Sequence, residues 1–206
     1  YREDISKVCA LIEMTLRGTP YVYQGQEISM GNCDFTSIDE INDVQAIGYY
    51  NNYLKKHHNK EKAFFRAKTG TRDNARTPFQ WSDKPNAGFT TGTPWMKITS
   101  DYRRYNAEDE MKRYDSVFNF YKAAIALRKQ YKGLVYGEFE REEGNNPPLY
   151  CYYRTYAGEK YYIELNLGTK PQKRNTDTET MQLLLSTKDS PTDFLRPFEG
   201  NVYKIF

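Results

Sequence analysis

Two arginines four residues apart, Arg72 and Arg76, are the side chains in this sequence best suited to bind a ligand. On one side of a helical turn, their planar and permanently charged guanidinium groups would donate hydrogen bonds to a polyhydroxylated ligand or to carboxylates across a cleft. Phe79 and Trp81 follow, and their faces suit an apolar ring surface. Pro78 disfavours the helical conformation at the preceding residue, so any helix ends near Thr77. The same residues also fit a loop held by salt bridges between arginines and acids, so the segment alone leaves both interpretations open.

The histidines and cysteines form no pattern typical of a metal or redox site. His57 and His58 are adjacent in a stretch rich in Lys and Asn, which indicates a solvated helix end. Cys9, Cys33 and Cys151 lie far apart and include no Cys-x-x-Cys pair. An odd and sparse set argues against a disulfide framework or a zinc site and suits a reducing compartment. We therefore predict no metal site, no cofactor and a cytoplasmic protein.

Charge and hydrophobicity argue against two classes of partner. The 206 residues include 30 basic and 27 acidic residues, giving a formal net charge of +3 with no long run of one sign. This pattern predicts neither a nucleic acid nor a membrane as partner. No apolar run approaches the ~18 residues of a membrane span, and no signal peptide is visible. With 38% hydrophobic residues, the chain can bury the core of one or two domains.

The first 131 residues are predicted to form helices and one short strand. Hydrophobic residues at helical spacing predict three helices, over residues 5–17, 37–56 and 115–131. Tyr21 to Tyr23 predicts a short strand, and the order helix, turn, strand is typical of an α/β barrel. Residues 59–70 are interpreted as a connector and residues 85–106 as a long loop.

After Gly133 the pattern changes to short β-rich runs. The predicted strands cover residues 134–136, 149–156, 161–167, 181–186 and 202–206. Turn signals separate them, among them residues 144–148. The many tyrosines of these strands are interpreted as packing residues rather than a ligand-binding surface. We therefore predict two domains, residues 1–131 and a small antiparallel β-domain of residues 132–206.

Three stretches together resemble the oligo-1,6-glucosidase and α-glucosidase branch of glycoside hydrolase family 13. They are residues 71–81 with 86–95, residues 18–28, and residues 37–46. Their order and spacing match the family, which is far more specific than any single motif. The resemblance implies an α/β plus β fold, in which the last strand and helices of a (β/α)₈ TIM barrel and its long active-site loops precede a small antiparallel β-sandwich.

The resemblance implies binding roles for three residues and a catalytic role for none. Arg72 matches an arginine that, with an upstream aspartate, holds hydroxyls at the non-reducing end of the substrate. Arg76 matches a second arginine at the pocket mouth. Gln45 stands where α-1,6-acting members commonly carry a glutamate near the leaving sugar, so the linkage preference stays open.

The family's catalytic carboxyl groups are expected outside this sequence. In the family they follow barrel strands four, five and seven, and the Asn-His-Asp motif of strand seven should shortly precede the first predicted helix. That motif is absent here. We therefore expect the nucleophile, the acid and a third carboxylate upstream of residue 1, and we expect the isolated chain to be inactive.

Two classes of function remain open. The first is part of a retaining, exo-acting α-glucosidase that hydrolyses short gluco-oligosaccharides together with its missing N-terminal half. Trehalose-6-phosphate hydrolase, dextran glucosidase and sucrose isomerase are related activities that these residues do not separate. The second class is a non-catalytic binding or scaffold module of the same fold. The intact Arg72, Arg76 and 86–95 loop favour the enzyme. Because one strand cannot close a barrel, we also expect a partner polypeptide to supply the other strands.

Overall fold

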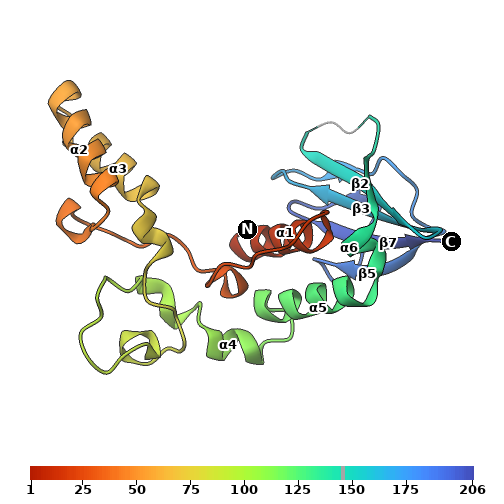
Figure 1. Cartoon of the computed structure of the whole chain (residues 1–206), viewed down its shortest axis with the longest axis horizontal. Helices are drawn as coiled ribbons and strands as arrows, with labels where there is room; N and C mark the ends of the chain where they lie inside the picture. Colours follow the sequence, from red (N-terminus) through yellow and green to blue (C-terminus); the bar gives the residue numbers. More distant parts are fainter. Residues whose placement is uncertain (145–146) are drawn as a thin grey trace. The chain divides into compact units, whose positions relative to one another are not determined.

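The computed structural model describes residues 1–144 and 147–206 (Figure 1). The chain forms two compact units, Tyr1–Glu27 with Arg113–Phe206, and Ile28–Lys112. This division differs from the predicted boundary between residues 131 and 132. The reason is that the first helix and the helix before residue 131 share one hydrophobic core with the β-sheet. The predicted boundary stays a prediction for the complete protein.

The helices of the first unit follow their apolar periodicity. Helix α1 (Arg2–Thr15) and helix α5 (Val117–Gln130) confirm two predicted helices, and the Ser116 hydroxyl caps α5 by accepting from the amide of Asn119 at 3.1 Å. Helix α6 (Lys132–Tyr136) follows directly. The predicted strand over residues 134–136 is wrong, because Leu134 is buried in the core as part of this helical turn.

The β-domain is antiparallel, as predicted. Its main sheet has the strand order β1 (Glu138–Arg141), β2 (Leu149–Tyr156), β3 (Glu159–Asn166), β7 (Gly200–Ile205), β5 (Gln182–Ser186). Strands β4 (Gln172–Lys173) and β6 (Phe194–Leu195) form a second sheet. Strands β2, β3, β5 and β7 confirm four predicted strands, while the sandwich arrangement stays a prediction. The predicted turn over residues 144–148 includes residues 145 and 146, which lie outside the described residues.

Two buried arginines bind the C-terminal end of α1. Arg154 donates to the backbone carbonyls of Thr15, Leu134 and Gly137. Arg128 donates to the carbonyls of Met14, Leu16, Gly18 and Leu134. A cation at the C-terminal end of a helix complements the partial negative charge of its last carbonyls. These arginines therefore join α1, α5, α6 and the sheet through backbone groups that the core would otherwise leave unsatisfied.

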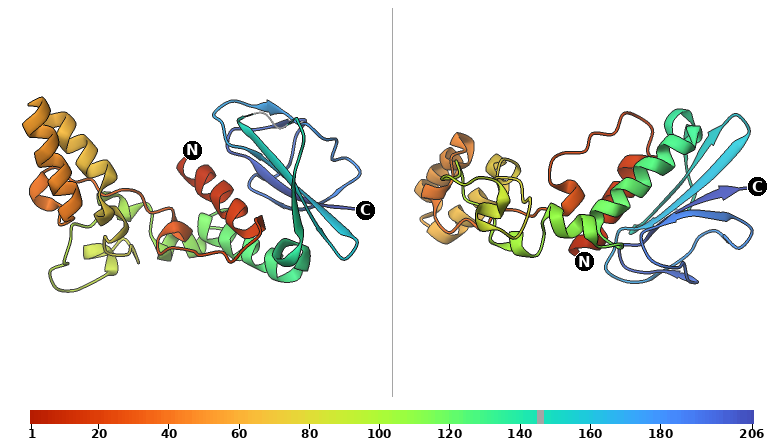
Figure 2. Two further views of the ribbon diagram at one scale, coloured as in Figure 1. Left: turned by 45° about the horizontal axis from the view of Figure 1, so that its top comes forward. Right: turned by 90° about the horizontal axis from the view of Figure 1, so that it is seen from below.

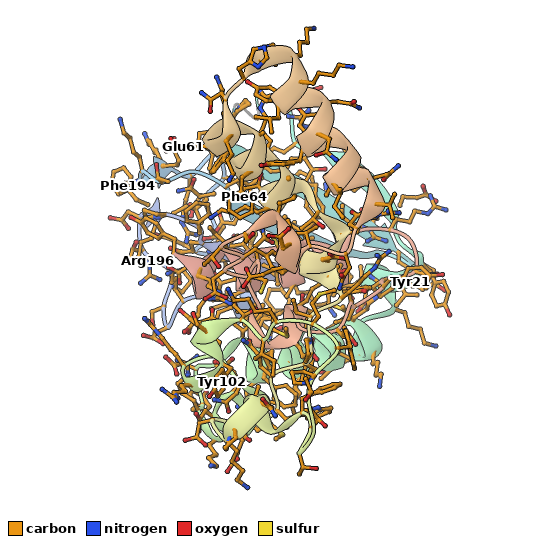
Figure 3. All side chains as sticks on the ribbon, turned by 90° about the vertical axis from the view of Figure 1, so that its left-hand side faces the viewer. Tyr21, Glu61, Phe64, Tyr102, Phe194 and Arg196 are labelled. Carbon is orange, nitrogen blue, oxygen red and sulfur yellow. The ribbon has the colours of Figure 1, made fainter. Side chains whose placement is uncertain are left out.

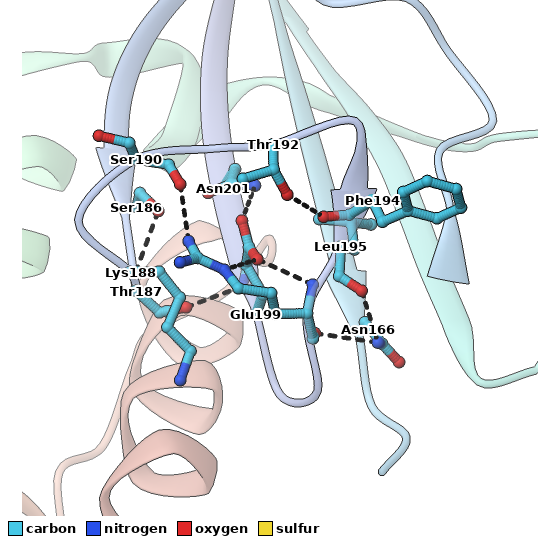
Figure 4. A network of polar contacts seen from close by, with 12 residues as sticks. Asn166, Ser186, Thr187, Lys188, Ser190, Thr192, Phe194, Leu195, Glu199 and Asn201 are labelled. Carbon is cyan, nitrogen blue, oxygen red and sulfur yellow. Dashed lines mark hydrogen bonds and ion pairs between the residues drawn. The ribbon is translucent and has the colours of Figure 1, made fainter. Parts of the chain in front are cut away.

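A smaller polar network fixes the turn before β7 (Figure 4). The Glu199 carboxylate accepts from the backbone amide and from the Nε of Arg196, both at 2.8 Å. The Asn166 amide donates to the carbonyls of Leu195 and Arg196, at 3.1 and 2.9 Å. These bonds hold β6 beside the end of β3, so the two sheets keep a fixed relation within this unit.

The second unit is built on a pair of helices that lie side by side, α2 (Val44–His57) and α3 (Lys60–Gly70) (Figures 1 and 2). The prediction of a connector over residues 59–70 is wrong. The Asn59 side chain caps α3 by accepting from the Lys62 amide at 2.8 Å, and the small side chains of Ala63 and Ala67 are buried one turn apart. A short capped helix with an alanine face has little apolar periodicity, so the sequence pattern did not reveal it.

Short 3₁₀ turns and one helix complete this unit. The predicted helix over residues 37–56 begins instead as a 3₁₀ turn, and the α-helix starts only after Asp43. The other elements are the 3₁₀ turns Arg72–Ala75, Pro85–Gly88 and Ser100–Arg103, and helix α4 (Ala107–Lys112). His58 adopts a left-handed conformation that ends α2, so the histidine pair lies at a helix end as predicted.

The predicted strand at residues 21–23 does not form. In the described part of the chain this segment belongs to neither sheet. Tyr21 is 82% exposed and projects from the surface (Figure 3). An extended segment becomes a strand only when a neighbour supplies the partners of its ladder, and the barrel arrangement therefore stays a prediction. None of the described helices is long and apolar enough to cross a membrane.

None of the three cysteines, all of which lie within the described residues, forms a disulfide. Cys33 and Cys151 are buried, and burial raises the pKa of Cys33 to about 11 and that of Cys151 to about 12. Both thiols are therefore protonated and poor nucleophiles at neutral pH.

Candidate functional site

A groove of about 490 Å³ lies on the second unit between the start of α2, the end of α3 and the 3₁₀ turn at Arg72. It is lined by Asp43, Gln45, Ala46, Tyr49, Arg66, Ala67, Thr69, Gly70 and Arg72. We call it the α2/α3 groove. It brings together Gln45 and Arg72, two of the three residues to which the resemblance gave binding roles.

The Arg72 guanidinium is held by the carboxylate of Asp43. Asp43 accepts from the backbone amide of Arg72 at 2.9 Å, from its Nε at 3.1 Å and from its Nη2. Asp43 also caps α2 by accepting from the Gln45 amide at 3.1 Å. The Asp43 side chain is buried while that of Arg72 is 53% exposed. The pair therefore orients the guanidinium and leaves it accessible from the groove.

A second buried carboxylate, that of Asp73, ties the 3₁₀ turn to the start of α2. Its Oδ2 accepts from the backbone amides of Asn42 and Asp43, at 2.6 and 2.9 Å. The Thr71 hydroxyl accepts from the Asp73 amide at 3.2 Å. The Asp73 carboxylate thus binds the backbone of Asp43, and the Asp43 carboxylate binds the backbone of Arg72, the residue next to Asp73.

Replacing Asp73 with alanine is expected to lower the free energy of unfolding by about 2–4 kcal/mol, because two backbone amides lose their acceptor in a buried position. Urea unfolding of the variant and the parent measures this. Asp39→Ala removes an exposed carboxylate of the same unit and should change stability by less than about 0.5 kcal/mol. Equal losses in the two variants would contradict the role given to Asp73.

The Asp43–Arg72 pair makes the unit sensitive to acid. The hydrogen bonds from the Arg72 side chain and backbone hold the pKa of Asp43 well below its usual range. A lowered pKa means that the Asp43 carboxyl binds a proton less readily in the native state than in the unfolded state. The stabilisation that the pair contributes is therefore complete above the unfolded pKa of about 4, and it is lost as the pH falls below that value. We expect melting temperature to fall below about pH 4 more steeply in the parent than in Asp43→Asn. Parallel profiles would show that the pair contributes nothing.

Arg76 lies apart from the described residues that line the groove. Its Nη1 is 3.7 Å from Asp73 Oδ1, and its side chain is half-exposed. The 3₁₀ turn ends at Ala75, so the two arginines are held by different carboxylates rather than side by side on one helical turn. The Arg76 carbonyl accepts from Trp95 Nε1 at 3.1 Å, which joins the 86–95 loop to this turn.

Four lining or bracing residues were missed by the sequence analysis: Asp43 as the partner of Arg72, Asp73, Arg66 and Tyr49. An aspartate just before a helical pattern is a usual N-cap signal, and it would have identified the first of them as a cap. Arg66 and Tyr49 gave no signal, because they come from two helices and one of these was interpreted as a connector. Arg66 Nη1 donates to the Tyr49 hydroxyl at 2.7 Å.

The arrangement is suited to binding rather than to covalent chemistry. Asp43 is the one carboxylate among the described residues that line the groove. Its oxygens accept from two backbone amides and from the Arg72 fork, so its lone pairs are occupied within the chain. A carboxylate held in this way orients a neighbour and is poorly placed to attack a substrate. The exposed donors of Arg72 and the amide of Gln45 can bind hydroxyl groups.

Comparison with known proteins identifies the family. The alpha amylase catalytic-domain family matches residues 1–137, so the chain belongs to the alpha-amylase family, which is glycoside hydrolase family 13. This confirms the predicted resemblance.

Similar proteins extend well beyond this chain. An oligo-1,6-glucosidase from Bacillus cereus is 35% identical over 100% of the chain and 38% of the relative. A trehalose-6-phosphate hydrolase from Bacillus subtilis is 33% identical over the same shares. The crystal structure of an isomaltulose synthase from Klebsiella has a TM-score of 0.91 at 34% identity, covering 98% of the chain and 38% of that protein. The chain thus spans 34–38% of the length of these curated relatives and others like them.

Proposed function

We propose that the chain is part of a retaining, exo-acting α-glucosidase of the oligo-1,6-glucosidase type, which hydrolyses terminal α-linked glucose from short oligosaccharides. The observation that carries the proposal is the α2/α3 groove, in which Arg72 and Gln45 meet. Support comes from the similarity to oligo-1,6-glucosidases along the whole chain. The geometry favours an enzyme over a scaffold module, because a scaffold would not need an accessible guanidinium oriented by a buried acid.

Three groove residues, and Arg76 outside the groove, have proposed roles. Arg72 binds hydroxyls of the terminal glucose, and Asp43 orients it. Gln45 faces the leaving sugar and donates or accepts a hydrogen bond without adding charge. Arg76, joined to Trp95, lies at the pocket mouth. The two catalytic carboxyl groups that retention requires belong to the part of the enzyme that this chain does not span.

A second candidate is a phosphorylated disaccharide as substrate, as the trehalose-6-phosphate hydrolases that resemble this chain would handle. One observation favours it: the groove contains two arginines, Arg66 and Arg72, and one carboxylate. An excess of guanidinium groups suits a phosphate ester. A trehalulose synthase of similar structure was solved in complex with its substrate sucrose, which adds sucrose as a third substrate to be tested.

The proposal is tested by giving the complete protein isomaltose, maltose, trehalose 6-phosphate and sucrose in separate reactions and identifying the products. We expect glucose from isomaltose at the highest kcat/KM. Preferred cleavage of trehalose 6-phosphate would replace the main proposal by the second candidate. Isomerisation of sucrose without net hydrolysis would contradict both, and no reaction with any substrate would favour a non-catalytic module.

A further inference from the structure

We infer that Arg66 and Tyr49 bind the leaving part of the substrate, at a second contact region of the α2/α3 groove. This inference rests on the proposed function and adds two residues to which no role has been given. The ligand it requires is an acceptor-rich second sugar, whose oxygens are either hydroxyls or a phosphate ester.

The two residues lie in the same groove as Arg72 but at a different place along it. Arg72 is held by Asp43, the N-cap of α2. Tyr49 follows six positions later, within α2. At a rise of 1.5 Å per residue this corresponds to roughly 9 Å along the helix axis. A ligand group bound by Arg72 therefore leaves room for a second group beside Tyr49 and Arg66.

Arg66 is held by tyrosines. Its Nη1 donates to the Tyr49 hydroxyl at 2.7 Å, and its guanidinium carbon lies 5.0 Å from the centre of the Tyr53 ring. Among the ion pairs found in the part of the chain that the structure describes, none includes Arg66. Its charge is thus not neutralised by a carboxylate, in contrast to that of Arg72. A guanidinium fixed by aromatic neighbours is prepared for oxygen acceptors of a ligand.

The groove is also lined by small side chains. Ala46 and Ala67 are among its lining residues. Tyr49 is 45% exposed, and because its oxygen accepts from Arg66, its own hydroxyl proton can be donated to a ligand. The groove therefore combines small apolar side chains with hydrogen-bond donors, and this combination suits the apolar face and the oxygens of a sugar ring.

The alternative is that the Arg66–Tyr49 bond only ties α3 to α2. Loss of a structural contact and loss of a ligand contact have different effects on the hydrolysis of individual substrates. α-Glucosyl fluoride has a glucosyl part and no leaving sugar, so a residue that contacts only the leaving sugar is irrelevant to its hydrolysis. A loss of structure would instead reduce the hydrolysis of every substrate.

The experiment measures kcat/KM of the complete protein for isomaltose, trehalose 6-phosphate and α-glucosyl fluoride, with Arg66→Ala, Tyr49→Phe and Lys68→Ala. Lys68 is the matched control, a basic residue of α3 that lies over the Phe64 ring and does not line the groove. We expect Arg66→Ala to lose about 10-fold or more with the preferred disaccharide, the scale of one charged hydrogen bond, and less than about 2-fold with the fluoride. Tyr49→Phe should show the same selectivity with a smaller loss.

The two sources of acceptor oxygens are separated by the substrate that is affected. A loss with isomaltose assigns the region to hydroxyls, and a loss confined to trehalose 6-phosphate assigns it to the phosphate ester. Equal losses with disaccharide and fluoride, or no loss with either disaccharide, would overturn the inference while the proposed glucosidase function stands. A parent enzyme that hydrolyses none of the three substrates would overturn both.

Discussion

Replacing Arg72 with alanine in the complete protein should lower kcat/KM for isomaltose by about 10²–10³-fold, the scale of removing one oriented charged donor from a reacting site. The Arg72 guanidinium is oriented by its ion pair with Asp43, and it remains accessible from the groove. If it binds the terminal glucose, the loss must be equally large for α-glucosyl fluoride, which contains that glucose. Steady-state kinetics with both substrates checks this.

Two further variants separate binding from stability. Arg72→Lys keeps the charge and loses the planar fork, so we expect an intermediate loss. Arg103→Ala removes an exposed arginine of the same unit that stacks on Tyr102, and it should leave kcat/KM unchanged. Should Arg72→Ala keep its activity and melt at a lower temperature, the pair with Asp43 would be a structural salt bridge and no more.

Replacing Arg154 with methionine should cost about 3–5 kcal/mol of unfolding free energy, because the buried carbonyls of Thr15 and Gly137 lose their charged donor and that of Leu134 keeps only Arg128. Methionine has a similar length and fills much of the space, so the loss reports the hydrogen bonds rather than a large cavity. Urea unfolding monitored by far-UV circular dichroism measures it.

The control for Arg154 is Lys170→Met, an exposed basic residue of the same unit between β3 and β4, which should change stability by less than about 0.5 kcal/mol. If Arg154→Met is as stable as the parent, the carbonyls of Thr15 and Gly137 must find other partners, since that of Leu134 keeps Arg128. The account of how α1 is joined to the sheet would then be wrong.

Elements with strong periodicity were predictable from the sequence. Helices α1 and α5 each bury a regular apolar stripe. In strands β2 and β3, apolar residues either alternate with polar ones or follow one another between turn signals, so the local pattern agrees with the observed burial. Helix α6 and the segment at Tyr21 were predicted wrongly because both are short and β-prone. Their structure depends on what packs or pairs with them, which local sequence does not encode.

The candidate site was predictable only in part. The resemblance singled out Arg72 and Gln45, and the structure places both in one groove. The carboxylate that orients Arg72 is distant in sequence, and Arg66 and Tyr49 meet only because α2 and α3 pack together. Contacts between elements are set by packing, so a pattern within one element cannot reveal them.

One measurement tests the central claim most directly: proton NMR of isomaltose incubated with the complete protein, followed from the first minutes. A retaining α-glucosidase releases glucose from the non-reducing end first as the α-anomer, which then equilibrates slowly with the β-anomer. We expect this signal, and we expect it to be lost with Arg72→Ala. Initial release of the β-anomer, or no glucose at all from an otherwise folded protein, would contradict the account.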